Sequence, residues 1–387
     1  MRHALVIAAL AACGGGDSGP DAHPIGVPGT YMVSGSVQYE DQAPLPTGGL
    51  GPITPKPVRG ALVTVVAEDD GAIIATGITD EAGAYALSFD GVGGEKLHVT
   101  AATTSTLPER PVTVSRTDGS VHGFGGLAFE AGIVMTSDVL ATVESGTAQA
   151  FNTFDVLVGV MDHIRAVYSH PTPVPLVAFW QRGSDDGTYY FERAMHLLGD
   201  QSDDDGFDDT VILHEAGHYI EEAEGRSDSP GGPHDGSPVD PRLAWSEGFA
   251  TYYALTVWGE PIYMDSNAGG GFAYNIDTQL TKANGGGVIG QDVSEDMVAE
   301  VLWDMGDAGG TDDDPLAGTH GPVLNVQSLY LKTAVLRAVG RPGADLVDAL
   351  DGFFVAAGLG TCGAMRTIVQ TTHTFPYDFA GPGGNCP

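Results

Sequence analysis

Short hydrophobic runs that alternate with polar positions dominate the chain between residues 30 and 130. Many of these positions are β-branched, and turn-forming residues separate one run from the next, which is the pattern of half-buried strands. The runs span residues 30–39, 61–68, 72–79, 84–89 and 96–103. Their regular spacing predicts an antiparallel β-sandwich over residues 30–130.

From residue 131 onward the hydrophobic period becomes helical. The segment 145–169 carries apolar residues at helical spacing and stops before the prolines of "HPTPVP". Residues 175–180 read as a buried strand, and residues 188–199 as a second strand or an extended edge. Further helices are expected at about 209–224, 241–258, 293–306, 324–339 and 343–357. Residues 131–387 are therefore predicted to form an α+β, mostly helical domain.

Composition narrows the range of partners. A chain of 387 residues is long enough for two domains, each with its own core. Its 16 Lys and Arg against 51 Asp and Glu give a net charge of -35, which would repel a nucleic-acid backbone. Nucleic acid is therefore excluded as an expected partner.

The N-terminus has the features of an export signal. Residues 1–12 contain an arginine, a short apolar run and small residues that end at Cys13. The sequence "LAAC" resembles the lipobox of bacterial lipoproteins, which implies acylation of Cys13, a flexible tether over residues 13–29 and a lipid anchor as the membrane contact. The implied location is the bacterial cell envelope, at the outer membrane or cell surface. A plain secretory signal with a chance cysteine is the alternative.

Two further cysteines, Cys362 and Cys386, remain if Cys13 is acylated. In an oxidising compartment an even pair favours a disulfide that ties the C-terminal tail to the last helix. Two free thiols are the alternative, because spacing alone does not bring the sulfurs together.

The segment "PVRGALVTVVAEDDGAIIATGITDEAGAYALSF" carries the turn residues 79–83 between two strands. It resembles the carboxypeptidase regulatory-like family, which implies a small transthyretin-like β-sandwich. The resemblance implies a fold more than a function. A structural role is expected over ligand binding, because no cluster of metal ligands or nucleophile and base occurs in this segment.

The segment "TVILHEAGHYIEEAEG" places His214 and His218 four residues apart, with Glu215 between them. On a helix these two rings project from one face about one turn apart, which suits two ligands of a tetrahedral Zn²⁺. Glu215 would lie beside the metal without binding it, where it can act as a general base.

A third ligand is predicted in "DPRLAWSEGFATYYALTVWG". Asp240 is a plausible N-cap for this helix and Pro241 its first residue. Glu247 shares a helix face with small and apolar residues, where a carboxylate is costly unless something pairs with it. Zinc would be that partner.

Two histidines on one helix and a glutamate on a later helix resemble the gluzincin metallopeptidases. "WSEGFA" looks like the third-ligand segment of the aminopeptidase N family, and "HEAGH" with the following glycines is similar to the fungalysin layout. The resemblance implies a zincin-type domain over residues 131–387 that hydrolyses peptides or proteins. Thr251, however, stands where many gluzincins carry an aspartate that orients a ligating histidine.

No segment typical of amine anchoring precedes the zinc helix, which favours an endopeptidase over an aminopeptidase. A surface binding protein with a structural or lost zinc site is the non-enzymatic alternative. Gluzincins stabilise the oxyanion with a histidine or tyrosine. His320 is the candidate donor here, with His234 and Tyr253 as alternatives, and for each of the three a surface or packing role is favoured over the catalytic one.

Acidic residues elsewhere suggest additional contacts. Glu300 and Asp304 could support the metal ligands or line the solvated face of a helix. The aspartate runs at residues 202–209 and 311–315 raise the possibility of Ca²⁺, since hard cations take clustered carboxylates, although solvated acidic loops have the same composition.

Overall fold

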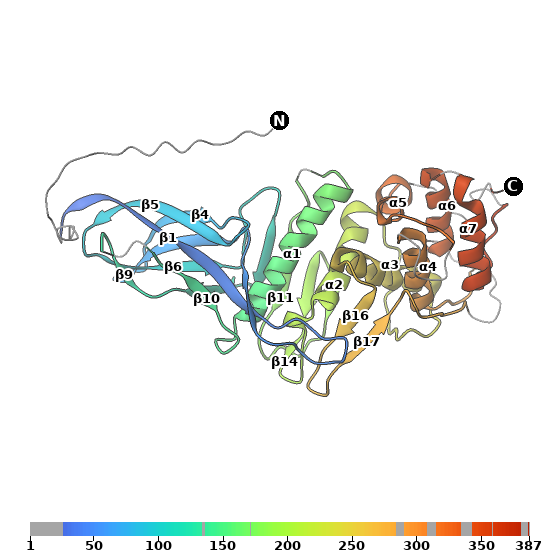
Figure 1. The fold of residues 1–387 in the computed structure, drawn as a ribbon, viewed down its shortest axis with the longest axis horizontal. Helices are drawn as coiled ribbons and strands as arrows, with labels where there is room; N and C mark the ends of the chain where they lie inside the picture. Colours follow the sequence, from blue (N-terminus) through green and yellow to red (C-terminus); the bar gives the residue numbers. More distant parts are fainter. Residues whose placement is uncertain are drawn as a thin grey trace.

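The protein is an elongated molecule with β-sheets at one end and helices at the other (Figure 1). The structure is a computed structural model that describes residues 26–133, 136–170, 172–283, 290–307, 315–333, 343–357, 359–380 and 386. Over these residues, strands in several sheets and seven α-helices make it a mixed α/β protein with a multidomain appearance. Among these described residues, none of the helices is long and apolar enough to cross a bilayer.

Two sheets form the N-terminal half. The first contains β1 (Pro28–Asp41), β2 (Thr54–Pro57), β5 (Ala84–Val92) and β10 (Val139–Ala141). The second contains β3 (Leu62–Ala67), β4 (Ile73–Ile78), β6 (Lys96–Ala102), β8 (Gly123–Gly125) and β9 (Phe129–Glu130). Side chains alternate between buried and more exposed along β3, β5 and β6, and the buried ones belong to one hydrophobic cluster. The five strands expected from the alternating pattern are confirmed.

The strand pairing departs from the all-antiparallel expectation in two places. β10 pairs with β1 in parallel, with Val37 opposite Val139. β7 (Val112–Ser115) leaves the N-terminal sheets and pairs in parallel with β11 (Leu176–Trp180). Parallel pairing needs a long crossover connection, which local turn signals do not reveal. Hydrogen bonding therefore crosses the boundary that the sequence placed at residue 130.

A second mixed sheet starts the C-terminal half, with strand order β12, β13, β11, β7. The segment 188–199, expected as one strand or an extended edge, forms a hairpin of β12 (Tyr189–Phe191) and β13 (Ala194–Leu197). Glu192 and Arg193 turn between them with φ of 49° and 68°. The preceding helix α1 (Ala148–Val167) contacts β7 and helix α2 (Asp209–Glu224).

The helices expected at about 209–224, 241–258, 293–306 and 343–357 begin and end close to those positions. The helix expected at 324–339 begins earlier, at residue 320, and residues 334–339 lie outside the described residues; the short helix at 362–366 was not expected. The helices of this half are α2 (Asp209–Glu224), α3 (Pro241–Trp258), α4 (Glu295–Gly306), α5 (His320–Val326), α6 (Leu346–Ala357) and α7 (Cys362–Arg366), with π-helical turns at Gln327–Leu331 and Thr367–Thr372. The short elements β14 (Gly199–Asp200), β15 (Asp203–Asp204) and a 3₁₀ turn at Asp205–Phe207 precede α2. A hairpin of β16 (Ile262–Asp265) and β17 (Phe272–Asn275) follows α3.

Helix α3 has clear local start and stop signals. The Asp240 carboxylate accepts a hydrogen bond from the backbone N–H of Arg242, and Pro241 occupies the first turn, where no N–H is needed. Gly259 ends the helix in the left-handed region at φ 86°. These signals fix the position of Glu247 along the helix.

Close packing of α2 against α3 depends on Gly217. A Cβ added at this glycine would lie 2.5 Å from the Cα of Ala250 and 3.0 Å from its Cβ. The two helices therefore approach each other more closely than any larger residue at position 217 would permit. This close contact lies between the two histidines of α2 and next to the turn of α3 that carries Glu247.

The β-sheet half is joined to the start of α2 by buried polar contacts. The Tyr39 hydroxyl on β1 donates to the side-chain carbonyl of Asn152 on α1 at 3.1 Å. The Asn152 amide donates in turn to Asp209, the first residue of α2, at 2.8 Å. Arg59 and Arg110 add ion pairs to Asp155 and Asp162 on α1. The N-terminal strands are thus hydrogen-bonded to the elements that position the metal-site helix.

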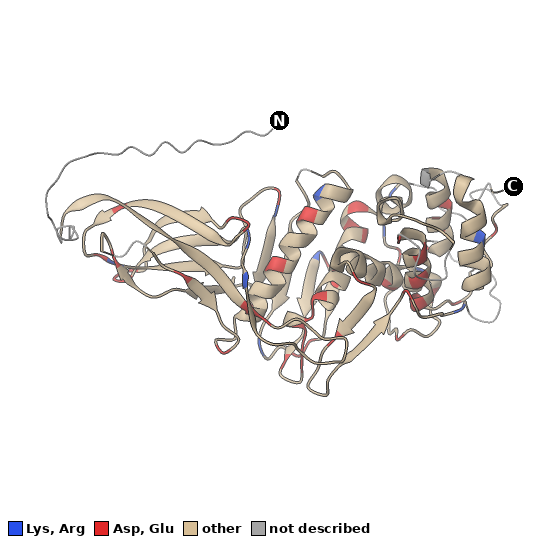
Figure 2. Cartoon of the chain, viewed as in Figure 1, with Lys and Arg blue, Asp and Glu red and all other residues tan. Residues whose placement is uncertain are grey.

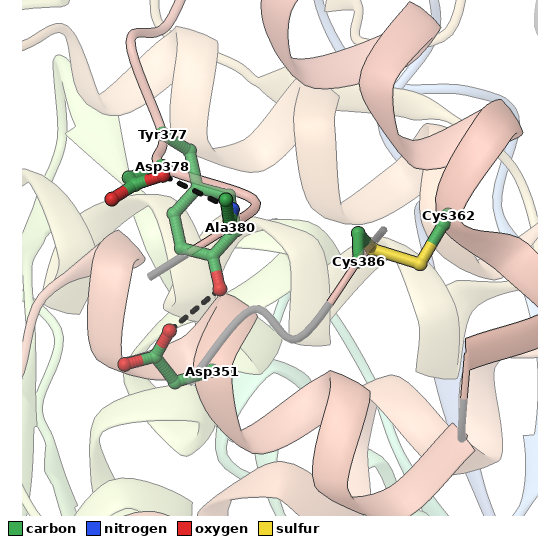
Figure 3. The surroundings of a disulfide bond; sticks show 6 residues. All are labelled: Asp351, Cys362, Tyr377, Asp378, Ala380 and Cys386. Atoms are coloured by element: carbon green, nitrogen blue, oxygen red, sulfur yellow. Dashed lines mark hydrogen bonds between the residues drawn. A yellow bond between two sulfur atoms is a disulfide. The ribbon is translucent and has the colours of Figure 1, made fainter. Parts of the chain in front are cut away.

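A disulfide fastens the C-terminal end of the chain. Cys362 at the start of α7 is bonded to Cys386, with their Cα atoms 5.8 Å apart (Figure 3). Next to it, the Tyr377 hydroxyl donates to the Asp351 carboxylate on α6 at 2.6 Å. These contacts hold the C-terminal segment on α6 and α7.

Candidate metal centre

Three side chains from two helices converge on one point. His214 and His218 project from α2, and Glu247 projects from α3. The Oε2 atom of Glu247 lies 3.2 Å from the Nε2 atom of His214 and 3.2 Å from that of His218. The three ligand atoms all lie within 4.8 Å of one another. The structure thus brings together the three residues that the sequence predicted as metal ligands.

These distances fit a zinc ion. Zn²⁺ bound by histidine nitrogens and a carboxylate oxygen at about 2.0–2.1 Å in a tetrahedron separates neighbouring ligand atoms by about 3.3 Å. The 3.2 Å distances from Glu247 agree with this value. The His214 and His218 rings are 5.0 Å apart at 85° to each other, so both nitrogens can face one ion.

Hydrogen bonds to neighbouring residues orient both histidines. The Nδ1 atom of His214 lies 3.0 Å from the Thr251 hydroxyl. The Nδ1 atom of His218 lies 3.2 Å from the Ser246 hydroxyl and 3.4 Å from the Glu221 carboxylate. Such contacts fix the ring orientation and leave Nε2 for the metal. Thr251 therefore contacts His214 as an orienting residue would, although many gluzincins carry an aspartate at this position.

The hydrogen-bonded pair of the Ser246 hydroxyl and the Glu221 carboxylate was not predicted from the sequence. Glu221 is buried and accepts a hydrogen bond from Ser246. Its position three residues after His218 and the position of Ser246 directly before Glu247 are the signals that could have indicated it, since residues three apart share a helix face.

Glu215 lies beside the three ligands without being one of them. It is 6% exposed, lines the same cleft as the ligands, and its Oε2 atom has no hydrogen-bond partner among the described residues. Burial raises the pKa of Glu215, with a further contribution from the charge of Glu247, while the two histidines act in the opposite direction. A buried carboxylate with one unpaired oxygen facing a cleft is suited to accept a proton from a bound molecule.

The electrostatic surroundings of Glu247 keep its carboxyl group ionised. Burial alone would raise the pKa of its carboxyl, but the charge of His218 and hydrogen bonds from both histidines hold the pKa well below its usual range. Glu247 is therefore a carboxylate at any physiological pH, which is the form that binds a metal.

A third histidine reaches the centre from the loop between α2 and α3. The Nε2 atom of His234 lies 3.6 Å from the Oε2 atom of Glu247, and its Nδ1 atom lies 3.1 Å from Glu295 at the start of α4. The hydrogen bond with Glu295 raises the pKa of His234 above the usual value for histidine. His234 therefore faces the cleft as a hydrogen-bond donor.

His320, the predicted oxyanion donor, lies elsewhere. Its Nδ1 atom is 3.1 Å from the Tyr252 hydroxyl, and its ring packs against Trp303 with the centroids 4.9 Å apart. It is not among the described residues that line the metal-site cleft, and neither is the fully buried Tyr253. The prediction that His320 is the oxyanion donor is therefore wrong, and His320 is a packing residue at the start of α5. Helix α3 presents Glu247 to the metal-site histidines and Tyr252 to His320, so His320 does not reach the metal ligands.

Glu300 and Asp304 also lie away from the metal ligands. Glu300 accepts hydrogen bonds from the backbone and hydroxyl of Thr281 at 2.7 Å. Asp304 pairs with the buried His373 at 2.9 Å. These side chains join α4 to the C-terminal π-helical turn instead of supporting the zinc ligands.

The metal-site residues open into a cleft of about 1370 Å³. One wall is the β16–β17 hairpin, whose Tyr263, Phe272 and Tyr274 rings stack on one another with centroids 5.4 to 6.3 Å apart. The Tyr263 ring meets that of His214 edge-on at 6.1 Å. A large concave site with an aromatic wall and a few convergent polar groups is typical of a ligand-binding site. The hydrophobic pattern of the sequence did not predict this hairpin.

A second group of carboxylates lines the same cleft. Oxygens of Asp203, Asp205 and Asp265 lie within 4.8 Å of one another. The first two belong to the aspartate run at residues 202–209, whereas Asp265 comes from β16 and was not foreseen. The other run, at residues 311–315, lies mainly outside the described residues, as does Cys13.

Comparison with known proteins supports a metallopeptidase. Residues 169–328 match the Mycolysin C-terminal domain family, and this segment contains His214, His218 and Glu247. Mycolysin-type domains come from zinc metallopeptidases, so the match supports a hydrolase of that kind acting on peptides or proteins. A comparison with curated protein sequences gave no match.

Solved structures give only weak similarities. The major plantain pollen allergen Pla l 1 is 19% identical, with a TM-score of 0.19, over 30% of this chain and 92% of that chain. A 9R-lipoxygenase from Cyanothece PCC8801 is 13% identical, with a TM-score of 0.18, over 38% of this chain and 25% of that chain. Neither similarity carries an argument about fold or function.

Proposed function

We propose that the protein is a zinc-dependent endopeptidase whose metal ligands are His214, His218 and Glu247. The observation that carries this proposal is the convergence of these three ligand atoms beside the buried carboxylate of Glu215. A purely structural zinc site has no use for Glu215, which does not bind the metal. The similarity to the Mycolysin C-terminal domain supports the same reaction class.

In this mechanism the chain's own residues handle the protons. Zinc in the site would lower the pKa of water towards about 7 and polarise the scissile carbonyl. Glu215 accepts the proton of the attacking water at its unpaired oxygen and then delivers it to the leaving amine. His234, oriented by Glu295, donates a hydrogen bond to the oxyanion that forms.

An endopeptidase is favoured over an aminopeptidase. The cleft holds about 1370 Å³, enough for chain on both sides of the cleaved bond. Two acidic residues beside the ligands, Glu221 and Glu295, are hydrogen-bonded to His218 and His234. These two carboxylates orient the histidines and are not free to anchor a substrate amine next to the metal ligands.

Export and lipid anchoring complete the proposal. The N-terminal signal and Cys13 favour a lipoprotein of the bacterial cell envelope, held at a membrane by its acyl chains alone. Labelling of the expressed protein with a radioactive fatty acid, in the parent and in Cys13→Ala, tests this part. Label on the parent only is expected, and label on both variants or on neither contradicts anchoring at Cys13.

The catalytic proposal is tested with Glu215→Gln. Zinc-loaded parent should cleave internal bonds of peptides with blocked N-termini, and the variant should bind zinc equally but cleave them about 10²–10⁴ times more slowly. Glu260→Gln is the matched control, since Glu260 is exposed beyond the end of α3. Cleavage that is unchanged in Glu215→Gln contradicts the mechanism, and cleavage of free N-terminal residues only would favour the aminopeptidase.

A further inference from the structure

The acidic group of Asp203, Asp205 and Asp265 lies partly buried on one side of the metal-site cleft. Asp205 is only 5% exposed, and its carboxylate accepts a hydrogen bond from Thr188. Burial and the neighbouring carboxylates raise the pKa of Asp205 to about 7 and that of Asp265 to about 6. Three acidic groups are thus held together at a free-energy cost that a cationic group would relieve.

These three carboxylates have no positively charged partner among the described residues. The ion pairs between described residues involve none of the three. The buried Oδ1 atom of Asp203, a member of the group, has no hydrogen-bond partner there either. An unpaired buried oxygen within a group of carboxylates points to a cationic ligand, because buried polar atoms are normally paired.

The group is close to the metal centre along strand β16. Side chains two residues apart on a strand face the same side, so Tyr263 and Asp265 both point into the cleft. The Tyr263 ring contacts His214. Asp265 therefore lies about 7 Å further along the strand, the distance spanned by two residues of an extended chain.

The cleft as a whole is more acidic than the chain. Ten of its 31 lining residues are Asp or Glu and none is Lys or Arg. The whole chain has 51 acidic and 16 basic residues among 387, so a random set of 31 residues would contain about four acidic residues and one basic residue. Figure 2 shows acidic residues in both halves of the molecule, so the cleft differs by its local excess of acidic residues and by the absence of Lys and Arg from its lining.

A basic side chain fits this site better than a metal ion. A lysine ammonium has three donors, which match three carboxylate oxygens, and its aliphatic stem can lie along the Tyr263 ring. Calcium takes six to eight oxygens, and the group offers three carboxylates in an open cleft.

We propose that Asp203, Asp205 and Asp265 form a subsite for a lysine or arginine side chain of the peptide substrate, within one or two residues of the cleaved bond. This inference rests on the proposed peptidase function and names its substrate class. Asp265 is the specificity-determining residue of the subsite, since it comes from the strand that also contacts the metal centre.

The test compares matched peptides that differ only in lysine or norleucine at one position near the cleavage point. The parent should cleave the lysine peptide with a kcat/KM at least about tenfold higher, and Asp265→Asn should lower kcat/KM for the lysine peptide by a much larger factor than for the norleucine peptide, so that the preference disappears. Asp186→Asn, in an exposed loop away from the cleft lining, is the control and should keep the preference. Measurable cleavage of both peptides by the parent with equal kcat/KM, or an equal fold loss on both in Asp265→Asn, overturns the subsite.

Binding separates this proposal from the catalytic one. The same peptides are titrated onto zinc-loaded Glu215→Gln, where turnover is not needed. Tighter binding of the lysine peptide supports the subsite even if the parent cleaves neither peptide, which would refute only the peptidase. Equal binding overturns the subsite. Calcium chloride is the last arm: binding of Ca²⁺ that Asp265→Asn abolishes, with no lysine preference, would identify the group as a divalent cation site instead.

Discussion

Replacement of Gly217 by alanine tests whether close packing of α2 on α3 sets the metal geometry. The new Cβ would lie 2.5 Å from the Cα of Ala250, whereas carbon atoms in contact prefer about 3.5–4.0 Å. The two helices must therefore separate by about 1 Å. Overpacking of this kind costs about 1–3 kcal/mol, partly offset by the roughly 1 kcal/mol that alanine gains over glycine in a helix.

The same displacement acts on zinc. His214 and His218 lie on one side of the interface and Glu247 on the other, and metal sites tolerate changes of only about 0.2 Å in ligand distance. We expect a zinc affinity at least about tenfold weaker, which corresponds to a further 1.4 kcal/mol of stability lost at saturating zinc.

Thermal unfolding with chelator and with zinc, together with zinc titration, measures both effects. Gly217→Ala should be less stable under both conditions, and the loss should be larger with zinc. Gly321→Ala is the control, because a Cβ at this position in α5 meets nothing within 4 Å. A Gly217→Ala protein with parental stability and parental zinc affinity would refute the argument.

Three further predictions follow from single contacts. Thr251→Val removes the hydrogen bond to His214 and should weaken zinc binding about 10- to 100-fold in a titration, and parental affinity would contradict an orienting role. Joint replacement of Cys362 and Cys386 by alanine, 24 residues apart, should lower the free energy of unfolding by about 3 kcal/mol, and a thermal stability equal to that of the oxidised parent would argue against this. Burial raises the pKa of Asp208 to about 8, so the folded state keeps a proton that the unfolded chain releases near pH 4. The stability due to this group is therefore full below about pH 4 and lost as pH rises towards 8. Asp208→Asn should flatten this decline in unfolding measured from pH 5 to 8, and an unchanged slope would show that Asp208 does not cause it.

Local patterns in the sequence predicted the elements that carry the metal ligands. The bounds of α2 and α3 agree with the periodicity and capping signals, and the four-residue spacing of His214 and His218 places them on one helix face. Glu247 could be recognised because a carboxylate among apolar residues needs a partner.

Contacts between distant segments could not be predicted in the same way. His234 lies in the loop after α2, and His320 is the first residue of α5. The three-dimensional path of that loop, which the sequence does not reveal, brings His234 and not His320 to Glu247. Asp265 joins Asp203 through a hairpin with no motif of its own. The parallel pairing of β10 with β1 likewise depends on a long connection, where turn chemistry gives no signal.

The most direct test of a zinc centre is the metal content of the purified protein. The protein lacking residues 1–13 and its Glu247→Ala variant are analysed by mass spectrometry after incubation with zinc. About one zinc per chain in the parent and a clear loss in the variant are expected for a site with three protein ligands. Absence of zinc from the parent, or equal zinc in both proteins, would contradict it.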